Sequence, residues 1–400
     1  MGSITSPLGF RASGVSCGLK DGDKLDLALI ECDVPAITAG VYTSNIIKGH
    51  SLQYTMGQVN DRQLCRALLI NSGNANACVG EIGDENAREM AKRVATEIDC
   101  DPGEVLIGST GVIGVPLDMK KIALGIQSAS AALDDSEEAG QRANQAILTT
   151  DTGTKQASAQ LKVQKKTVTI GGMAKGSGMI HPNLATMIGV ITTDARISAG
   201  CLQRLLSDAV YNTFNRITVD GDSSCCDMVI VMASGMVGHP VISDPKSPDA
   251  QLFRQKLIEV CDELSRKIAK DGEGATKLVD VRVINAASEE DAYKAALAVA
   301  KSPLVKTAIF GEDANWGRII NAVGYSGARF DPDTLDIQIG GITVCQQGKA
   351  GTYAEADAAA ALREDEVEIV IDMNQGTFSD HFWTCDFSYD YIKINASYRS

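Results

Sequence analysis

Length, composition and charge already exclude several classes of protein. The 400 residues are enough for two domains, and 44% hydrophobic with 22% charged residues is the profile of a globular chain rather than a disordered one. Asp and Glu outnumber Lys and Arg by 51 to 37, which gives a formal net charge of −14. The sequence therefore predicts no nucleic-acid partner and no attraction to an anionic membrane.

The numbers and spacing of the cysteines and histidines indicate where the protein is located and whether it binds a metal ion. The 11 cysteines are odd in number and lack C-x-x-C spacing, which favours reduced thiols and a cytoplasmic protein. None of the 4 histidines stands four residues from another, so the sequence predicts no zinc site and no other metal site. The uncharged run 176–193 is interrupted by His181, Pro182 and Asn183 and is not expected to span a membrane.

Along the chain, apolar β-branched runs predict strands and a 3.6-residue periodicity predicts helices. The predicted strands are 67–70, 157–163, 167–170, 187–192, 229–231, 279–283 and 367–371. The predicted helices are 85–98, 137–148, 199–214, 250–269 and 289–300, with N-cap candidates Asp84, Ser136, Ser198 and Asp249. The loose alternation predicts a layered α/β (α+β) protein with domains 1–274 and 275–400, divided at the turn 271–274.

Residues 171–186 (GGMAKGSGMIHPNLAT) form a small-residue loop that leads into an apolar strand. Thr186, preceded by Ala185, has the layout of a self-cleaving junction, in which its hydroxyl attacks the preceding carbonyl and leaves a new N-terminal threonine. The freed α-amine, with a pKa of about 8, is then a general base on the nucleophile itself. By pattern alone, a glycine-rich turn before a core strand explains the segment better.

The loop and strand resemble the processing site of the ornithine acetyltransferase (glutamate N-acetyltransferase) family, and the resemblance runs essentially from end to end. The blocks that look like that family's, in its order, are 7–15 (PLGFRASGV), 71–78 (NSGNANAC), 149–152 (TTDT), 217–222 (ITVDGD), 315–318 (NWGR) and 389–396 (YDYIKINA). Several blocks in register are far more specific than any single one.

The resemblance implies catalytic roles at three positions. Thr186 is the nucleophile, generated by cleavage of the Ala185–Thr186 bond. Thr110 and Gly111 form the oxyanion hole, since a hydroxyl and a backbone N–H can stabilise a tetrahedral oxyanion. The alternative for these two residues is a glycine turn between a strand and a helix.

The resemblance also implies a set of substrate contacts. Lys175 pairs with the substrate α-carboxylate, where the alternative is a surface lysine without a role. Glu273 holds a cationic amine, where the alternative is a solvated carboxylate in a turn. The remaining substrate contacts are Thr152, Thr186, Asn395 and Ser400.

The chain departs from the family pattern at two places. After residues 220–222 the family usually continues with Ser or Thr residues and then Thr-Asn-Asp-Thr, whereas residues 223–228 of this chain are SSCCDM, with Cys225 and Cys226 in the middle. The tail lacks the usual acidic residue at Ser397 and has Arg399 where a small hydroxyl residue is common. These departures leave the nucleophile unaffected and bear on the acceptor preference and on the roles of Asn395 and Ser400.

Fold and activity follow from the resemblance. It implies an αββα-type sandwich of the ornithine acetyltransferase fold, self-processed into fragments 1–185 and 186–400 that assemble as α2β2. The implied enzyme is an acyltransferase of arginine biosynthesis, which moves acetyl from N2-acetylornithine to glutamate through an acetyl-Thr186 intermediate without a cofactor.

Three alternatives remain open. An amidase or aminopeptidase with the same threonine chemistry would transfer the acyl group to water. A bifunctional enzyme would also use acetyl-CoA, and no sequence feature decides this. A non-enzymatic binding protein would stay uncleaved and would form no acyl intermediate.

Overall fold

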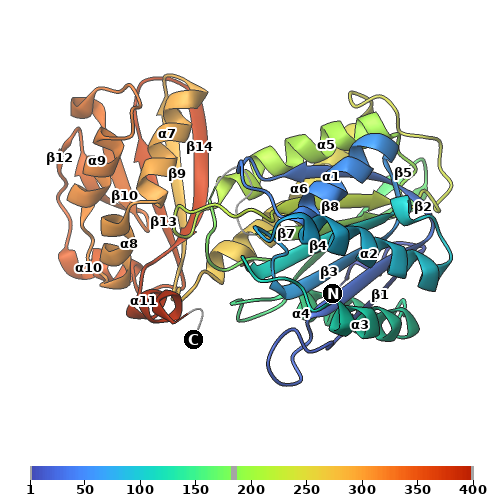
Figure 1. Cartoon of the computed structure of the whole chain (residues 1–400). Helices are drawn as coiled ribbons and strands as arrows, with labels where there is room; N and C mark the ends of the chain where they lie inside the picture. The colour runs from blue at the N-terminus through green and yellow to red at the C-terminus, as the bar shows by residue number, and fades with distance from the viewer. Residues whose placement is uncertain (1, 182–186, 398–400) are drawn as a thin grey trace. The chain divides into compact units, whose positions relative to one another are not determined.

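In the computed structural model, which describes residues 2–181 and 187–397, the chain forms two compact units (Figure 1). Unit 1 contains the described residues of Met1–Gly176, Asn183–Asn215 and Ser223–Leu264, and unit 2 those of Ser177–Pro182, Arg216–Asp222 and Ser265–Ser400. The predicted division after residue 274 and the predicted fragments 1–185 and 186–400 stay predictions. Among the described residues, no helix has both the length and the apolarity to cross a bilayer.

Unit 1 is built on an eight-stranded mixed sheet, counted over the described residues. Its strands are β1 (Phe10–Val15), β2 (Leu27–Tyr42), β3 (Leu64–Asn74), β4 (Val105–Val112), β5 (Lys155–Val163), β6 (Lys166–Lys175), β7 (Ile188–Thr193) and β8 (Met228–Ala233). They pair in the order β4-β3-β2-β8-β7-β6-β5, with β1 beside β2. The β3–β4 and β7–β8 pairs are parallel, and the others are antiparallel.

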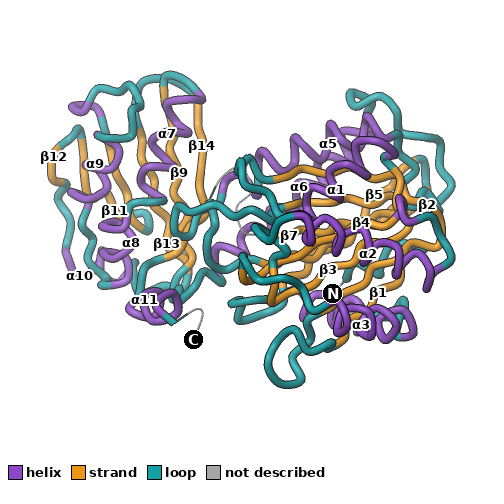
Figure 2. Tube along the Cα trace, in the orientation of Figure 1, coloured by secondary structure: helices purple, strands orange, loops and turns teal. Residues whose placement is uncertain are grey.

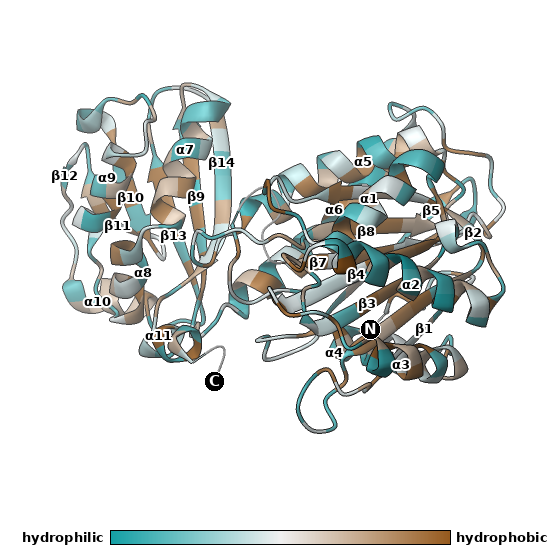
Figure 3. Cartoon of the chain, viewed as in Figure 1, coloured by the Kyte–Doolittle hydropathy of each residue, from teal (hydrophilic) through white to brown (hydrophobic). Residues whose placement is uncertain are grey.

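The helices of unit 1 cover this sheet (Figure 2). They are α1 (His50–Arg62), α2 (Glu81–Ile98), α3 (Met119–Ala131), α4 (Glu137–Ile147), α5 (Ala199–Asn212) and the first part of α6 (Pro248–Lys270). In Figure 3 the strands are largely brown, whereas α2 turns a hydrophilic surface outward. Apolar strands between amphipathic helices are the arrangement that the sequence pattern predicts.

Successive side chains of β2 and β3 point to opposite faces of the sheet, so each face has its own apolar core. Leu29 of β2 and Leu69 of β3 pack with α2 and α3, whereas Ile30 and Leu68, one residue away, point to the opposite face. That opposite face shares one apolar core with residues of β6, β7 and β8, among them Met173. Helices and strands are thus packed in layers on both faces of the sheet, which agrees with the predicted layered α/β fold.

Most predicted elements of unit 1 are present, and two N-cap predictions are wrong. Ser136 accepts a hydrogen bond from Ala139 N at 3.3 Å, as expected of the α4 N-cap, and Ser198 precedes α5. The helix predicted from residue 85 begins at Glu81, so Asp84 lies inside its first turn and contacts His50 Nδ1. Asp249 likewise lies inside α6.

A six-stranded sheet forms the centre of unit 2, again counted over the described residues. Its strands are β9 (Leu278–Ala286), β10 (Asp336–Ile339), β11 (Ile342–Gln346), β12 (Lys349–Ala350), β13 (Glu366–Asp372) and β14 (Phe378–Cys385), in the order β12-β11-β10-β13-β9-β14. The β9–β13 pair is parallel and its neighbours are antiparallel. The helices of the unit are α7 (Glu289–Ala300), α8 (Pro303–Phe310), α9 (Trp316–Gly324), α10 (Glu355–Ala361) and α11 (Tyr389–Ala396).

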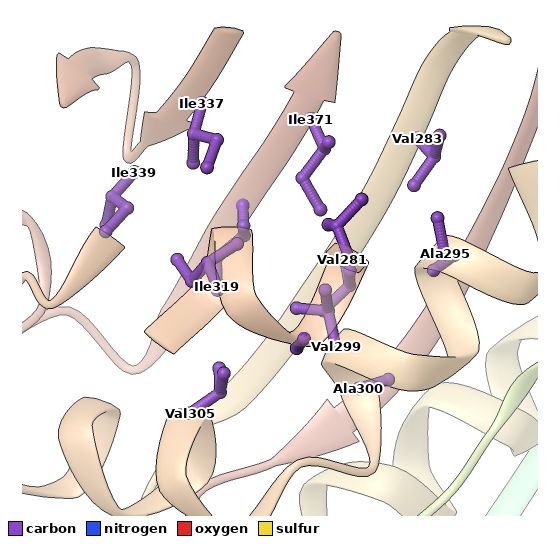
Figure 4. Packing of buried hydrophobic residues seen from close by; sticks show 14 of the residues in the cluster. Val281, Val283, Ala295, Val299, Ala300, Val305, Ile319, Ile337, Ile339 and Ile371 are labelled. Carbon is purple, nitrogen blue, oxygen red and sulfur yellow. The ribbon is translucent and has the colours of Figure 1, made fainter. Parts of the chain in front are cut away.

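One face of this sheet forms the core of unit 2. Val281 and Ile371, on neighbouring strands, point toward Val299 of α7 and Ile319 of α9 (Figure 4). Each of these side chains is at most 3% exposed, and burying a branched aliphatic side chain contributes about 1.5–3 kcal/mol. Unit 2 therefore has its own apolar core.

Candidate active site

Thr110 and Lys175 meet because the strands that carry them contribute to the same core. Thr110 lies four residues after Leu106 on β4, and Lys175 lies two residues after Met173 on β6, so each continues the inward face of its strand. Leu106 and Met173 belong to one apolar cluster. At the ends of these strands the Lys175 Nζ donates to the Thr110 Oγ1 at 3.3 Å.

The backbone at Gly111, next to Thr110, needs glycine. Its φ is 132°, in the region that other residues rarely adopt. A Cβ atom there would come within 2.3 Å of the carbonyl carbon of Gly73 on the neighbouring strand β3. Because a carbonyl carbon in the sheet cannot move aside cheaply, a side chain at 111 would disturb the strand end that holds Thr110.

A buried carboxylate, Asp151, organises the surroundings of Lys175. Its Oδ1 accepts hydrogen bonds from Lys155 Nζ at 2.7 Å and from Gly176 N at 2.6 Å, and its Oδ2 accepts one from Thr149 N at 3.0 Å. Because Gly176 directly follows Lys175, this bond holds the end of β6. We call Thr110, Asp151, Lys155 and Lys175 the Lys175 cluster.

Asn144 of α4 joins β5 to β6 beside this cluster. Its Nδ2 donates to Ala174 O at 3.0 Å, and its Oδ1 accepts from Lys155 N at 2.7 Å. Asn144 is fully buried, so both bonds replace water contacts that the amide cannot make. The helix thereby fixes the backbone on both sides of the two lysines.

Within the Lys175 cluster, burial and neighbouring charges have opposite effects on the pKa values of the side chains. Burial lowers the pKa of Lys175, while the negative charges of Asp151 and Asp227 act in the opposite direction. Burial alone would raise the pKa of Asp151, but Lys175 and Lys155 lower it to about 2. The carboxylate therefore stays ionised near neutral pH and supplies the counter-charge for the two ammonium groups.

A second lysine, Lys20, lies within electrostatic range of Lys175. Its Nζ donates to Leu148 O at 2.6 Å and to Leu25 O at 3.0 Å. Burial, together with the charge of Lys175, lowers the pKa of Lys20 to about 8, although the negative charge of Asp26 acts in the opposite direction. Positively charged and negatively charged side chains thus alternate around Lys175, with Lys20 and Lys155 close to Asp26 and Asp151.

In unit 2, Glu273 and Asn395 form a direct contact. Glu273 Oε2 accepts a hydrogen bond from Asn395 Nδ2 on α11 at 2.8 Å, and the Glu273 side chain is buried. Gly178 makes room for this carboxylate, because a Cβ atom at 178 would lie 2.2 Å from the Glu273 Cδ. The buried position rules out the alternative of a solvated turn carboxylate.

Asp220 holds the loop that contains Gly178. Its two carboxylate oxygens accept hydrogen bonds from Met179 N at 2.6 Å and from Ile180 N at 3.0 Å. Glu273 N donates to Ser177 O at 3.1 Å and ties the same loop from the other side. We call Gly178, Asp220, Glu273 and Asn395 the Glu273 cluster.

The structure describes only some of the other predicted site residues. Thr152 is exposed, in the loop between α4 and β5 directly after Asp151. Ala185, Thr186, Arg399 and Ser400 lie outside the described residues. Strand β7 begins at Ile188, which pairs with Lys175, so the predicted nucleophile stands two positions before the cross-strand partner of Lys175.

The sequence as a whole matches the ArgJ family over residues 11–400. The chain belongs to the ArgJ family. It is 49% identical to the arginine biosynthesis bifunctional protein ArgJ of Symbiobacterium thermophilum, over 100% of this chain and 99% of that protein. Identity to the protein of the same name from Caldanaerobacter subterraneus is 48%, over 100% of this chain and 99% of the other. The crystal structure of ArgJ from Bacillus halodurans matches with a TM-score of 0.50 and 47% identity, covering 51% of this chain and 96% of that one.

Several residues of this ArgJ-family chain emerge only from the structure. Asp151 lies in the block 149–152, but the sequence did not predict its ion pair with Lys155. Charged residues four positions apart indicate a contact only within a helix, and Lys155 instead begins strand β5. Asp220 also lies in a quoted block without an assigned role. Asn144 gave no signal, since a buried asparagine inside a helix pattern resembles an ordinary polar position. Among the described residues, no group of three His, Cys, Asp or Glu side chains is arranged to hold a metal ion.

Proposed function

We propose that the chain is a glutamate N-acetyltransferase of arginine biosynthesis, which transfers acetyl from N2-acetylornithine to glutamate. The observation that carries the proposal is the buried Lys175–Thr110 contact at 3.3 Å, with Gly111 beside it. A hydroxyl and a backbone N–H at a strand end suit an oxyanion, and the ammonium group suits a carboxylate. Membership of the ArgJ family supports the pathway.

The reaction is a double displacement. The Thr186 oxygen attacks the acetyl carbonyl of N2-acetylornithine, the amide C–N bond breaks, and ornithine leaves with a proton on its α-amine. The resulting acetyl-threonine ester is then attacked by the α-amine of glutamate, which gives N-acetylglutamate and restores the hydroxyl. Thr110 and Gly111 stabilise the oxyanion in both halves of the reaction.

Substrate recognition follows from charge. Both substrates carry an α-carboxylate, for which Lys175 is the proposed partner. Only N2-acetylornithine carries a cationic side chain, for which the buried Glu273 carboxylate is the proposed partner, with Asn395 holding that carboxylate in place. Thr152 and Ser400 are the remaining proposed substrate contacts.

Cleavage between Ala185 and Thr186 accompanies this mechanism. The two fragments would stay together, because β7 and β8 of the second fragment pair with β6 and β2 of the first. The ArgJ chain from Bacillus halodurans is 96% covered by about half of this chain, the length expected of one fragment. The assembled enzyme is proposed to be a cytoplasmic α2β2 tetramer.

A second activity is favoured by the relatives, which are named bifunctional proteins. In this chain it would be acetyl transfer from acetyl-CoA to glutamate, through the same threonine. Acetyl-CoA and N2-acetylornithine would then give the same acetyl-enzyme and differ only in the leaving group. Release of free CoA in the presence of glutamate measures this activity directly.

The decisive experiment combines kinetics with mass spectrometry. Initial rates measured against both substrates should give parallel double-reciprocal lines, because one substrate leaves before the other binds. Mixing the enzyme with N2-acetylornithine alone should add one acetyl group to the 186–400 fragment. Intersecting lines together with an unmodified fragment would contradict the covalent mechanism, and acetate release without need of glutamate would indicate an amidase.

A further inference from the structure

Two adjacent cysteines, Cys225 and Cys226, are separated from the start of β8 by one residue, Asp227. Their Sγ atoms are 3.4 Å apart. Cys226 is buried against Ala75 and Ala77, whereas Cys225 is only partly covered. The pair therefore combines a sulfur that a small molecule can reach with a second sulfur already in contact with it.

The two thiols differ in reactivity. A hydrogen bond from Cys226 lowers the pKa of Cys225 to about 7, against the effect of burial. Burial instead raises the pKa of Cys17 to about 12 and that of Cys100 to about 11. Because the thiolate is the reactive form, Cys225 is activated where these other thiols are not.

A bond between neighbouring cysteines is strained. Consecutive Cα atoms are about 3.8 Å apart, whereas disulfides usually join Cα atoms about 4.4–6.8 Å apart. Strained disulfides are reduced more readily than structural ones. A bond at this position would therefore be reversible.

The pair is connected to the Lys175 cluster through the residues that follow it. Asp227 supplies negative charge that favours the ammonium form of Lys175. Met228 pairs with Ile188, which in turn pairs with Lys175. On the other side, Cys225 O accepts a hydrogen bond from Gly49 N at 2.8 Å. Closing a ring between residues 225 and 226 must turn the peptide that links them, and this moves Asp227 and the start of β8.

We propose that Cys225 and Cys226 are a peroxide-sensitive thiol pair whose oxidation to a vicinal disulfide reversibly slows the chemistry at the Lys175 cluster. The Cys225 thiolate attacks one peroxide oxygen, the O–O bond breaks, and one water is released after proton uptake. The Cys226 sulfur then displaces water from the resulting sulfenic acid and forms the S–S bond. Two thiols and one hydrogen peroxide thus give one disulfide and two waters.

The test compares the wild-type chain with Cys225→Ser, Cys226→Ala and the control Cys78→Ser, which removes an exposed cysteine elsewhere. Each protein is reduced, treated with a small excess of hydrogen peroxide, alkylated with N-ethylmaleimide and measured by peptide mass. In wild type and in Cys78→Ser, the peptide that contains residues 225 and 226 should lose two hydrogens and take up no maleimide. Dithiothreitol should restore both alkylation sites.

Activity is measured in parallel, as the rate after peroxide relative to the same protein in its reduced state. Wild type and Cys78→Ser should lose roughly tenfold and recover with dithiothreitol, while Cys225→Ser should keep its reduced-state rate. Two alkylated thiols after peroxide, or an equal loss in Cys225→Ser, would overturn the proposal, as would a disulfide that leaves the rate unchanged. The rate effect rests on the proposed acetyl transfer, but the mass measurement does not, so a reduced enzyme without acetyl transfer would contradict only the proposed function.

Discussion

In the Lys175 cluster two buried lysines surround one carboxylate at the ends of strands, whereas in the Glu273 cluster two carboxylates are held by backbone amides and one asparagine. Asp151 bonds Lys155 Nζ and the backbone of Thr149 and Gly176. Glu273 instead meets Asn395 on α11, whose outer side chains Tyr389 and Ile392 are exposed. The first cluster is fixed by a rigid sheet, and the second depends on a short surface helix. Substitutions in the first should therefore affect both substrates and the fold, and those in the second should affect one substrate.

The largest loss of activity should come from a substitution of Thr186, the predicted nucleophile, which belongs to neither cluster. Thr186→Ala should give an uncut and inactive chain, because alanine has no oxygen for cleavage or for acyl transfer. Denaturing electrophoresis and intact mass will detect a single chain of 42.3 kDa. Thr186→Ser is the control and should still cleave, since the hydroxyl survives. Two fragments from the alanine variant would contradict self-processing at this bond.

Removing one charge from each cluster tests the comparison most directly. Lys175→Met should weaken the binding of both substrates by about 2–5 kcal/mol, or roughly 30- to 5,000-fold in kcat/KM, because the carboxylate of each substrate loses its charged partner. Glu273→Gln should reduce kcat/KM for N2-acetylornithine more than for glutamate. The two variants control for each other, and the measurement is kcat/KM for each substrate. If Glu273→Gln lowered kcat/KM equally for both substrates, Glu273 would not recognise the side chain of N2-acetylornithine.

Removing the Thr110 hydroxyl separates catalysis from binding within the Lys175 cluster. Thr110→Ala should lower kcat by roughly 10²–10³ with little change in KM, because an oxyanion-hole contact strengthens as the transition state forms. Thr110→Ser should retain most of the rate, since it keeps the donor. A variant with unchanged kcat would show that Thr110 does not touch the oxyanion.

The smallest effect concerns stability and pH. Because the pKa of Asp151 is depressed from 3.8 to about 2, its ionised form stabilises the fold at neutral pH, and this contribution is lost as pH falls from about 4 toward 2. Asp151→Asn should lower the free energy of unfolding by about 2 kcal/mol at pH 7, and its difference from wild type should shrink below about pH 4. Urea unfolding at several pH values measures this.

The exposed Asp135 provides the matched control for that prediction. Asp135→Asn removes a carboxylate of the same type from the surface, where little free energy is expected from its charge. It should leave the unfolding midpoint nearly unchanged at every pH. An Asp151→Asn variant as stable as this control at pH 7 would indicate that the buried carboxylate is not what holds the end of β6.

Most of the helices and strands, and the resemblance to the family, can be predicted from the amino-acid sequence. Apolar β-branched runs located β3, β5, β6, β7, β8, β9 and β13, because a buried strand needs a run of apolar residues in the local sequence. The 16-residue strand β2 was missed, since Pro35 and the register irregularity between Glu31 and Ala36 interrupt its alternation. The predicted Asp84 and Asp249 caps failed because Gly80 and Ser247 precede the helices instead.

The contacts between residues that are distant in sequence could be found only from the folded chain. The resemblance named Thr110 and Lys175, but their contact arises because two strand faces 65 residues apart in sequence enter one core. Glu273 and Asn395 are 122 residues apart, and Asp151 acquires its role from the backbone of Gly176 and the side chain of Lys155. The local sequence pattern predicts on which face of a strand a side chain lies. Its contact partner across the core depends on how strands that are distant in sequence pack together, and no single segment specifies that packing.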